Sequence, residues 1–310
     1  MPARDGIPPE REGRGTMMPA TPLLKWVGGK RQLLPELSKY IPATFGRYHE
    51  PFLGGGALFF ALAADKRLGD GASLSDANLE LVNVYQRVRD DVSSVVEHLK
   101  EMEPRQDKDT YLAVRQSFNE HSLGECSQSW RAAQFIYLNK VGFNGLHRVN
   151  ASGKFNVPHG KRSAPVVFDA ENLRACSAAL QCADVTPGDF FERLARAAPG
   201  DLVYCDPPYA PVSDTANFTG YTAGGFGPSQ QKTLRDLAWD LSKRGVNVIL
   251  SNADVPSIRE LYALPCFELH AVQAKRAINC DAGKRGAVGE LIITAGASRG
   301  RSPRGADSIR

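Results

Sequence analysis

The chain has 310 residues, of which 42% are hydrophobic and 23% charged, and its net charge is +4. These values are those of an ordinary globular protein with one or two domains. The six cysteines are scattered without a CxxC pair, no apolar run is long enough to span a bilayer, and the start lacks a signal-peptide pattern. We therefore expect a cytoplasmic protein with no metal site and no membrane span.

Strand and helix patterns alternate along most of the chain. The Pro-, Gly- and Arg-rich residues 1–20 and the basic residues 297–310 are predicted to be unstructured tails. Between them, strands are expected at 48–52, 72–76, 201–205, 247–251, 268–272 and 290–294, and helices at 31–40, 57–66, 93–103, 110–119, 129–140 and 230–243. This alternation predicts an α/β fold, with a parallel sheet covered by helices on both faces. The helical, basic stretch 79–164 is interpreted as an insertion between the two parts of one domain, 21–78 and 165–296.

The strand expected at 201–205 is followed directly by Asp206, Pro207, Pro208 and Tyr209. Two prolines stiffen the chain and lack amide donors, and their carbonyls stay free to accept. A carboxylate and a carbonyl can both accept from an exocyclic amino group, while a tyrosine ring stacks on a planar base. These features suit a nucleobase that is flipped out of its duplex for chemistry. By itself, the motif is equally compatible with a simple Pro-Pro turn.

A glycine-rich turn follows the first predicted strand. The glycines Gly54–Gly56 allow positive φ and a close approach of a ligand, and the helix after them offers unpaired amides. Asp76, at the end of the next strand, is placed to accept from ribose hydroxyls. The pattern predicts a dinucleotide or an adenosine-bearing cofactor, although the incomplete GxGxxG spacing weakens the dinucleotide reading and a structural turn is the alternative. Upstream, Trp26 and Lys30 flank a Gly-Gly turn and suit contacts to an adenine ring or a carboxylate.

Residues 126–168 contain no Asp or Glu but six Lys or Arg. Such a patch suits a polyanion, and a solvated basic loop is the alternative. Within it, arginine and asparagine side chains such as Arg148 and Asn144 can read guanine and adenine edges, and Phe143 can wedge beside an opened base pair. The alternative for this loop is a Gly/Asn turn whose Phe143 and Leu146 pack into the core.

Five segments resemble, in order, the motifs of the Dam family of DNA adenine-N6 methyltransferases. They are LLKWVGGK (23–30), EPFLGGG (50–56), SDANLELVNVY (75–85), YLNKVGFNGLHRVNASGKFNVPHG (137–160) and CDPPYAPVSDTANFTGY (205–221). Signals similar to two further motifs, LSNAD (250–254) and KRAIN (275–279), follow them. The resemblance implies a Rossmann-like class I methyltransferase sheet with an inserted, mainly helical DNA-recognition domain. The implied activity is that of a site-specific, adenine-specific DNA methyltransferase (EC 2.1.1.72). Such an enzyme moves a methyl group from S-adenosyl-L-methionine to adenine N6 in double-stranded DNA by base flipping and direct transfer, here in GATC.

The resemblance also assigns a role to individual residues. The catalytic residues are Asp206, Pro207 and Tyr209. The expected cofactor contacts are Trp26, Lys30, Phe52, Gly54, Gly56, Asp76, Asp189, Phe190 and Asp206. The expected DNA contacts are Lys25, Lys140, Phe143, Asn144, Leu146, Arg148, Asn150, Pro158 and Arg276. No metal is required for this chemistry.

The sequence departs from the family pattern at His147 and at Lys275–Asn279. Two alternative functions stay open, a methyltransferase for another amino group (an RNA base or a protein glutamine) and a catalytically silent DNA-binding regulator. The carboxylate of Asp206 favours adenine, because asparagine is more usual for glutamine and serine for cytosine N4. We expect a monomer or weak dimer associated with the nucleoid, and the sequence leaves open whether a cognate restriction enzyme accompanies it.

Overall fold

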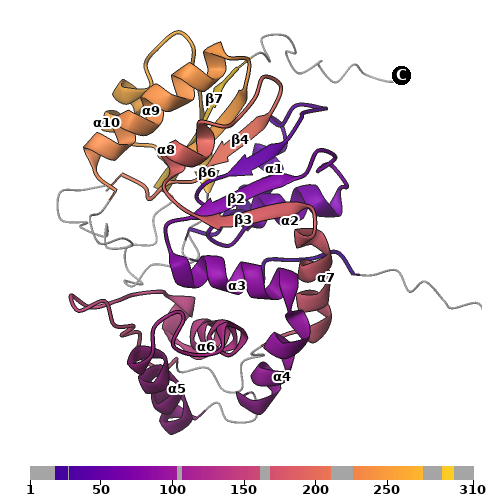
Figure 1. Ribbon diagram of the computed structural model, residues 1–310. Coiled ribbons are helices and arrows are strands. Elements are labelled where there is room, and N and C mark those ends of the chain that lie inside the picture. The colour runs from indigo at the N-terminus through magenta and orange to yellow at the C-terminus, as the bar shows by residue number, and fades with distance from the viewer. Residues whose placement is uncertain are drawn as a thin grey trace, which may run out of the picture.

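A seven-stranded sheet forms the centre of the molecule. The computed structural model describes residues 18–26, 28–102, 107–160, 168–210, 226–274 and 288–296. Their strands are β1 (Tyr48–Glu50), β2 (Ala72–Asp76), β3 (Ala183–Pro187), β4 (Leu202–Cys205), β5 (Asn247–Ala253), β6 (Glu268–Ala274) and β7 (Val288–Ala295). They lie in the order β3-β2-β1-β4-β5-β7-β6, as Figure 1 shows. Neighbours from β3 to β5 are parallel, and β7 is antiparallel to β5 and β6.

Helices cover both faces of this sheet. Successive residues of a strand point to opposite sides, so apolar residues of one strand contribute to a core on each face. In β4, Leu202 and Tyr204 belong to one buried core, and Val203 and Cys205 belong to a second. The second core is covered by α8 (Phe190–Leu194), α9 (Pro228–Lys243) and α10 (Pro256–Leu261), in the upper part of Figure 1. The expected α/β architecture with helices on both faces is thereby confirmed. The sheet is mixed, however, and not parallel throughout as expected, because β7 runs antiparallel to β5 and β6.

The first core extends from the sheet into a group of helices. It includes residues of α1 (Leu34–Leu37), α2 (Ala57–Ala64), α3 (Leu79–Asp90), α4 (Val92–Met102), α5 (Lys108–Glu120), α6 (Gln128–Val141) and α7 (Ala170–Leu180). In Figure 1, α4, α5 and α6 lie below the sheet, with α3 between them and the strands. α3 packs against β2 and β3 as well as α4 and α6, so it joins the helical region to the sheet. The domain boundaries at 79 and 164 stay a prediction.

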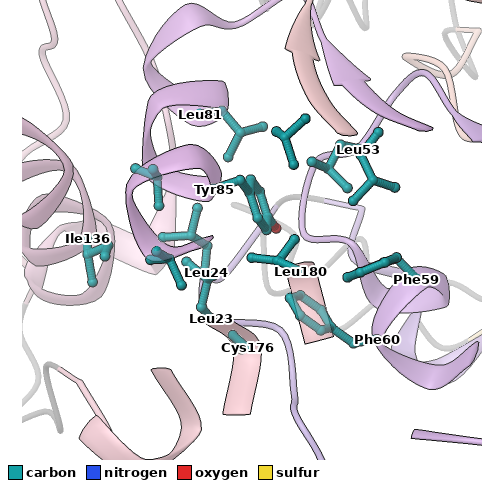
Figure 2. Close-up of a cluster of buried hydrophobic side chains, with 14 of the residues drawn as sticks. Leu23, Leu24, Leu53, Phe59, Phe60, Leu81, Tyr85, Ile136, Cys176 and Leu180 are labelled. Carbon is teal, nitrogen blue, oxygen red and sulfur yellow. The ribbon is translucent and has the colours of Figure 1, made fainter. Parts of the chain in front are cut away.

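Tyr85 of α3 links this core to the glycine-rich turn. Figure 2 shows Leu53, Leu81 and Leu180 around its ring. The Tyr85 side chain is fully buried, and its hydroxyl donates to the carbonyl oxygen of Gly54 at 3.0 Å. A buried hydroxyl that lost this acceptor would cost about 1–3 kcal/mol. The core therefore holds the turn in a defined position.

The helices α7, α8 and α10 were not expected, and three further elements differ from the sequence-based expectation for a local reason. The helix expected at 31–40 is a 3-10 turn (Lys30–Gln32) followed by the short α1, because Pro35 has no amide to continue the first turn. β1 ends at Glu50, where Pro51 follows. β3 was not expected, since it is a short edge strand that ends in Pro187 and has a mixed burial pattern.

The predicted tails lie almost wholly outside the described residues. Of the first tail, Met18 is exposed and Ala20 packs against the first core. Within the described parts of the chain, no helix is long and apolar enough to cross a membrane, and no three His, Cys, Asp or Glu side chains are grouped to hold a metal ion.

Candidate active site

Three carboxylates lie at the carboxyl ends of three adjacent parallel strands. Glu50 ends β1, Asp76 ends β2, and Asp206 directly follows β4, while the strand order is β2-β1-β4. Because parallel strands end at one edge of the sheet, the glycine-rich turn and the Asp206 motif meet there. This edge is where ligands bind in open α/β sheets.

The glycine-rich turn is held from both sides. Gly54 and Gly56 have φ of +46° and +62°, a region that L side chains rarely adopt. The Gly54 amide donates to Asp76 Oδ2 at 3.1 Å, and the Asn78 amide donates to Asp76 Oδ1 at 2.9 Å. Burial raises the pKa of Asp76, and these amides hold it down. Asp76 thus ties the end of β2 to the turn, and each oxygen keeps a lone pair for a further donor such as a hydroxyl.

The Trp26 side chain packs directly against the glycine-rich turn. A Cβ built on Gly54 would lie 2.7 Å from Trp26 Cδ1, and one built on Gly55 would lie 3.3 Å from Trp26 Cβ. Nothing larger than glycine fits at Gly54 without moving the tryptophan. The turn and the ring together form a cradle of backbone and aromatic surface.

We expect Gly54→Ala to weaken cofactor binding strongly while the chain still folds. The added methyl both strains a positive φ and displaces Trp26, so affinity for S-adenosylmethionine should fall about tenfold or more, on the scale of 1–2 kcal/mol of backbone strain. Isothermal titration calorimetry measures this affinity. Gly69→Ala is the matched control, because a Cβ there meets nothing within 4 Å. Equal affinity of the two variants would contradict the cradle.

An aromatic cluster borders the same edge. The rings of Phe52 and Phe190 stack at 5.3 Å between centroids, and Phe226 meets Phe52 edge-on at 5.6 Å. Asp189 directly precedes Phe190 as the N-cap of α8, where its side chain accepts from the Phe191 amide at 2.8 Å. Phe52, Asp189 and Phe190 were expected from the sequence to lie by the cofactor, whereas Phe226 was not foreseen because its segment carries no motif.

The described partners of Asp206 hold it through one of its two carboxylate oxygens, Oδ1. Lys30 Nζ lies 3.0 Å from Asp206 Oδ1, and the Ser251 hydroxyl donates to the same oxygen at 2.7 Å. No described residue donates to Oδ2, and 21% of the side chain remains exposed. Burial raises the pKa of Asp206, while Lys30 and Ser251 hold it down. The carboxylate therefore has a fixed orientation with one oxygen available.

Lys30 also contacts the other end of the motif. Its ammonium lies 4.5 Å from the centroid of the Tyr209 ring and donates to the Gly28 carbonyl at 2.5 Å. With 6% of its surface exposed, this lysine is almost fully buried between the two catalytic candidates. Its predicted contact to the cofactor stays a prediction.

A polar network from α9, β5 and β7 holds Pro208, Tyr209 and Ala210. Gln231 donates to the Pro208 carbonyl at 3.0 Å and accepts from Asn252, and Asn252 in turn accepts from the Ala210 amide at 3.2 Å. The Tyr209 hydroxyl donates to Glu290 Oε2 at 3.3 Å. No described residue donates to the Pro207 carbonyl. No role was predicted for Gln231, Asn252 or Glu290, although the polar residues Ser251 and Asn252 of β5 lie in the segment 250–254, which resembles a family motif.

Glu50 is the third carboxylate, and we expect it to make stability fall with rising pH. Its side chain accepts from the Tyr48 hydroxyl at 2.9 Å, and burial raises its pKa from 4.5 to about 8. The folded state thus keeps a proton that the unfolded chain releases, and this stabilisation is lost as the pH rises toward 8. Glu50→Gln imitates the protonated form, so its free energy of unfolding should not fall in this way. Its stability advantage over the native chain should therefore be about 2 kcal/mol larger at pH 8 than at pH 6. Urea unfolding at both pH values measures the gain, and an equal difference at the two would contradict it.

The predicted recognition segment is presented to solvent. Phe143 is 38% exposed and Asn144 has a left-handed backbone with φ of +55°, so the alternative that packs Phe143 into the core is wrong. Leu146 is half-buried against the first core. Arg148 and Pro158 are exposed, while Asn150 uses its side-chain oxygen to accept two amides of the turn that follows.

Trp26 and Lys25 connect the predicted recognition segment to the glycine-rich turn. The Trp26 ring, which lies on Gly54, also stacks on His147 at 6.0 Å and 22°. Asn139 accepts from the Lys25 amide at 2.9 Å and donates to the Gly145 carbonyl at 2.9 Å. Burial lowers the pKa of His147 to about 4, which keeps the ring neutral in this aromatic setting. The unusual His147 is therefore a packing residue.

Two members of the basic stretch are partly or wholly buried. Arg131 is 5% exposed, forms an ion pair with Glu80 at 2.6 Å and stacks on Phe118, so it does not belong to the expected polyanion-binding patch. A carboxylate distant in sequence thus neutralises it. Burial lowers the pKa of Lys140 to about 8, and the nearby positive charge of Lys25 adds to this. Arg276, another expected DNA contact, lies outside the described residues.

The strand order, with β7 antiparallel beside β5, and the candidate site at the carboxyl ends of the strands are those expected of a Rossmann-like methyltransferase. Residues 26–278 match the D12 class of N6 adenine-specific DNA methyltransferases. The chain belongs to this family, and it is therefore an adenine-specific DNA methyltransferase that depends on S-adenosylmethionine. The turn around Gly54, the carboxylate of Asp76 and the aromatic cluster fit that cofactor in the chemistry of their donors and surfaces.

Named relatives match nearly the full length of the chain. A type II methyltransferase, M1.LlaDCHI of Lactococcus lactis subsp. cremoris, is 39% identical over 275 residues, covering 88% of this chain and 94% of its own. The type II methyltransferase M.MjaIII of Methanocaldococcus jannaschii is 37% identical, covering 89% and 99%. A DNA adenine methylase of Vibrio cholerae is 35% identical, covering 87% and 94%.

Proposed function

We propose that this chain methylates the N6 amino group of adenine in GATC, after flipping the base out of duplex DNA. The observation that carries the proposal is the orientation of Asp206. Both of its described partners, Lys30 and Ser251, contact Oδ1, so that Oδ2 is left for the amino group. The Pro207 carbonyl, the next residue along, is a second acceptor.

The chemistry requires a better nucleophile than an ordinary aromatic amine. Bound S-adenosylmethionine supplies an electrophilic methyl group on a sulfonium. Asp206 Oδ2 and the Pro207 carbonyl accept the two amino hydrogens, which turns the nitrogen toward sp³ and directs its lone pair at that methyl. As the N–C bond forms, positive charge develops on the amino nitrogen, and these two acceptors stabilise it. The proton is released after transfer, and the sulfur keeps the electrons of the broken S–C bond.

The remaining residues hold the base and the duplex. Tyr209 stacks on the flipped adenine, and its hydroxyl is anchored on Glu290. Phe143 and Asn144 are both exposed, and they fill the space that the flipped adenine leaves in the DNA duplex. Arg148 reads a guanine, which is the contact arginine makes most often in the major groove. We further propose that the enzyme acts in the cytoplasm as a monomer or weak dimer.

Transfer of a labelled methyl group tests the proposal directly. The substrates are two duplexes that differ in a single GATC site, together with a structured RNA. The proposal expects label on N6 of adenine in the GATC duplex alone. Label in the duplex without GATC would overturn the recognition site, label in the RNA would favour the other amino-group substrate, and no label at all would favour the silent regulator.

A further inference from the structure

Arg148 is exposed, yet its guanidinium is held in place by one residue. Its Nε donates to the Asn156 side-chain oxygen at 2.7 Å, and its Nη2 donates to the Asn156 backbone carbonyl at 3.0 Å. Two donors of one edge of the planar group thus bind two acceptors of a single residue. Neither acceptor carries a formal charge, and no other described residue binds this guanidinium.

The backbone fixes these two residues opposite one another. The Asn156 amide donates to the Arg148 carbonyl at 3.0 Å, and Val149 pairs with Phe155 in an antiparallel bridge. Asn150 closes the hairpin by donating its amide to the Lys154 carbonyl at 2.9 Å. Phe155 is 5% exposed and anchors the hairpin in the first core. The arginine and its partner therefore keep their register before any DNA arrives.

A guanidinium has five N–H donors arranged as a rigid fork. Asn156 occupies the edge made by Nε and Nη2, so the terminal edge made by Nη1 and Nη2 keeps two parallel donors. Guanine presents two acceptors, O6 and N7, to such an edge in the major groove. We propose that Asn156 is a positioning residue that orders the guanidinium of Arg148 so that this terminal edge meets a guanine; the proposal rests on the reading role proposed for Arg148.

Ordering the arginine in advance lowers the entropy lost on binding, since a free arginine has many rotamers. An asparagine does this without placing a negative charge beside the phosphates. Residues 126–168 contain no carboxylate, which agrees with that requirement. Asn156 therefore acts on the discrimination of one base and leaves the attraction to the DNA backbone unchanged.

The test is a binding comparison between two duplexes with the full-length enzyme and S-adenosylhomocysteine. One duplex contains the target site with ordinary guanines. In the other duplex, 7-deazaguanine, which lacks the N7 acceptor, replaces the guanines of that site. For the native enzyme, we expect the second duplex to bind about tenfold more weakly. Asn156→Ala should reduce this ratio to about threefold or less, because the terminal edge is no longer ordered.

Three further variants separate the possible causes. Asn156→Asp keeps an acceptor at the same place, so it should restore the native ratio while weakening both complexes through its charge. Lys154→Ala, in the same hairpin, should leave the ratio unchanged. Arg148→Ala should bring the ratio close to one; if it does not, guanine reading by Arg148 itself is wrong. If Arg148→Ala abolishes the ratio and Asn156→Ala preserves it, the reading role stands and the positioning role of Asn156 is overturned.

Discussion

Asp206→Ala is expected to lower the rate of methyl transfer by about a thousandfold or more, since removing a comparable charge-stabilising group costs 10²–10³ and here the nucleophile is also no longer oriented. Binding of S-adenosylmethionine should change far less, because the glycine-rich turn, Asp76 and the Phe52 cluster do not depend on this carboxylate. Single-turnover transfer measures the rate, and calorimetry measures cofactor binding.

The control for this variant is Asp240→Ala. Asp240 lies on α9 with 70% of its side chain exposed and pairs only with Lys243, at 3.6 Å, among the described residues. Circular dichroism is needed for Asp206→Ala, because the variant leaves the Lys30 ammonium buried without its carboxylate, which destabilises a fold. A folded Asp206→Ala enzyme with native transfer rates would overturn the proposed mechanism.

Lys30→Met is expected to slow transfer about a hundredfold and to move the acidic limb of the pH–rate profile to higher pH. The change keeps an unbranched side chain like the aliphatic part of the lysine and removes the charged amino group. Burial already raises the pKa of Asp206 and Lys30 opposes that effect, so losing the ammonium raises this pKa further. Since the ionised carboxylate is the active form, activity should then be lost at a higher pH as the solution is acidified.

Ser251→Ala provides the matched comparison, because it removes a neutral donor from the same oxygen of Asp206. It should shift the limb in the same direction by a smaller amount. Rates between pH 5 and pH 9 at saturating cofactor and DNA measure both variants. If Lys30→Met raised KM for the cofactor while kcat and the pH profile stayed native, the lysine would be a cofactor contact and not a positioning residue for Asp206.

Much of the site was predictable from local sequence. The chemistry of the strand end at Asp206 follows from a carboxylate, two prolines and a tyrosine in succession, and the turn at Gly54 follows from consecutive glycines. Both features depend on neighbours in the chain, because φ restrictions and missing amides are properties of the residues themselves. β3 was missed because a short edge strand has too little apolar alternation to be recognised.

Charge along the sequence was a poorer guide than local motifs. Arg131 and Arg148 lie in the same acid-free stretch, yet one is buried against Glu80 and the other is exposed on a hairpin. A carboxylate from α3 decides the difference, and the sequence of the basic stretch does not contain it. The same limit applies to Phe226, which joins the Phe52 ring from a segment without a motif.

The sequence by itself determined the family, the order of its motifs and the kinds of side chain at the candidate active site, because each of these is encoded in contiguous segments. The tertiary structure decided how those side chains are used. It brings Lys30, from before the first strand, and Ser251, from β5, to the same oxygen of Asp206, and it places Asn156 against Arg148. Such contacts depend on strand order and on the distance between atoms that are far apart in the chain. The contacts that leave Oδ2 of Asp206 without a donor among the described residues, and those that hold Arg148 on Asn156, are therefore properties of the folded protein.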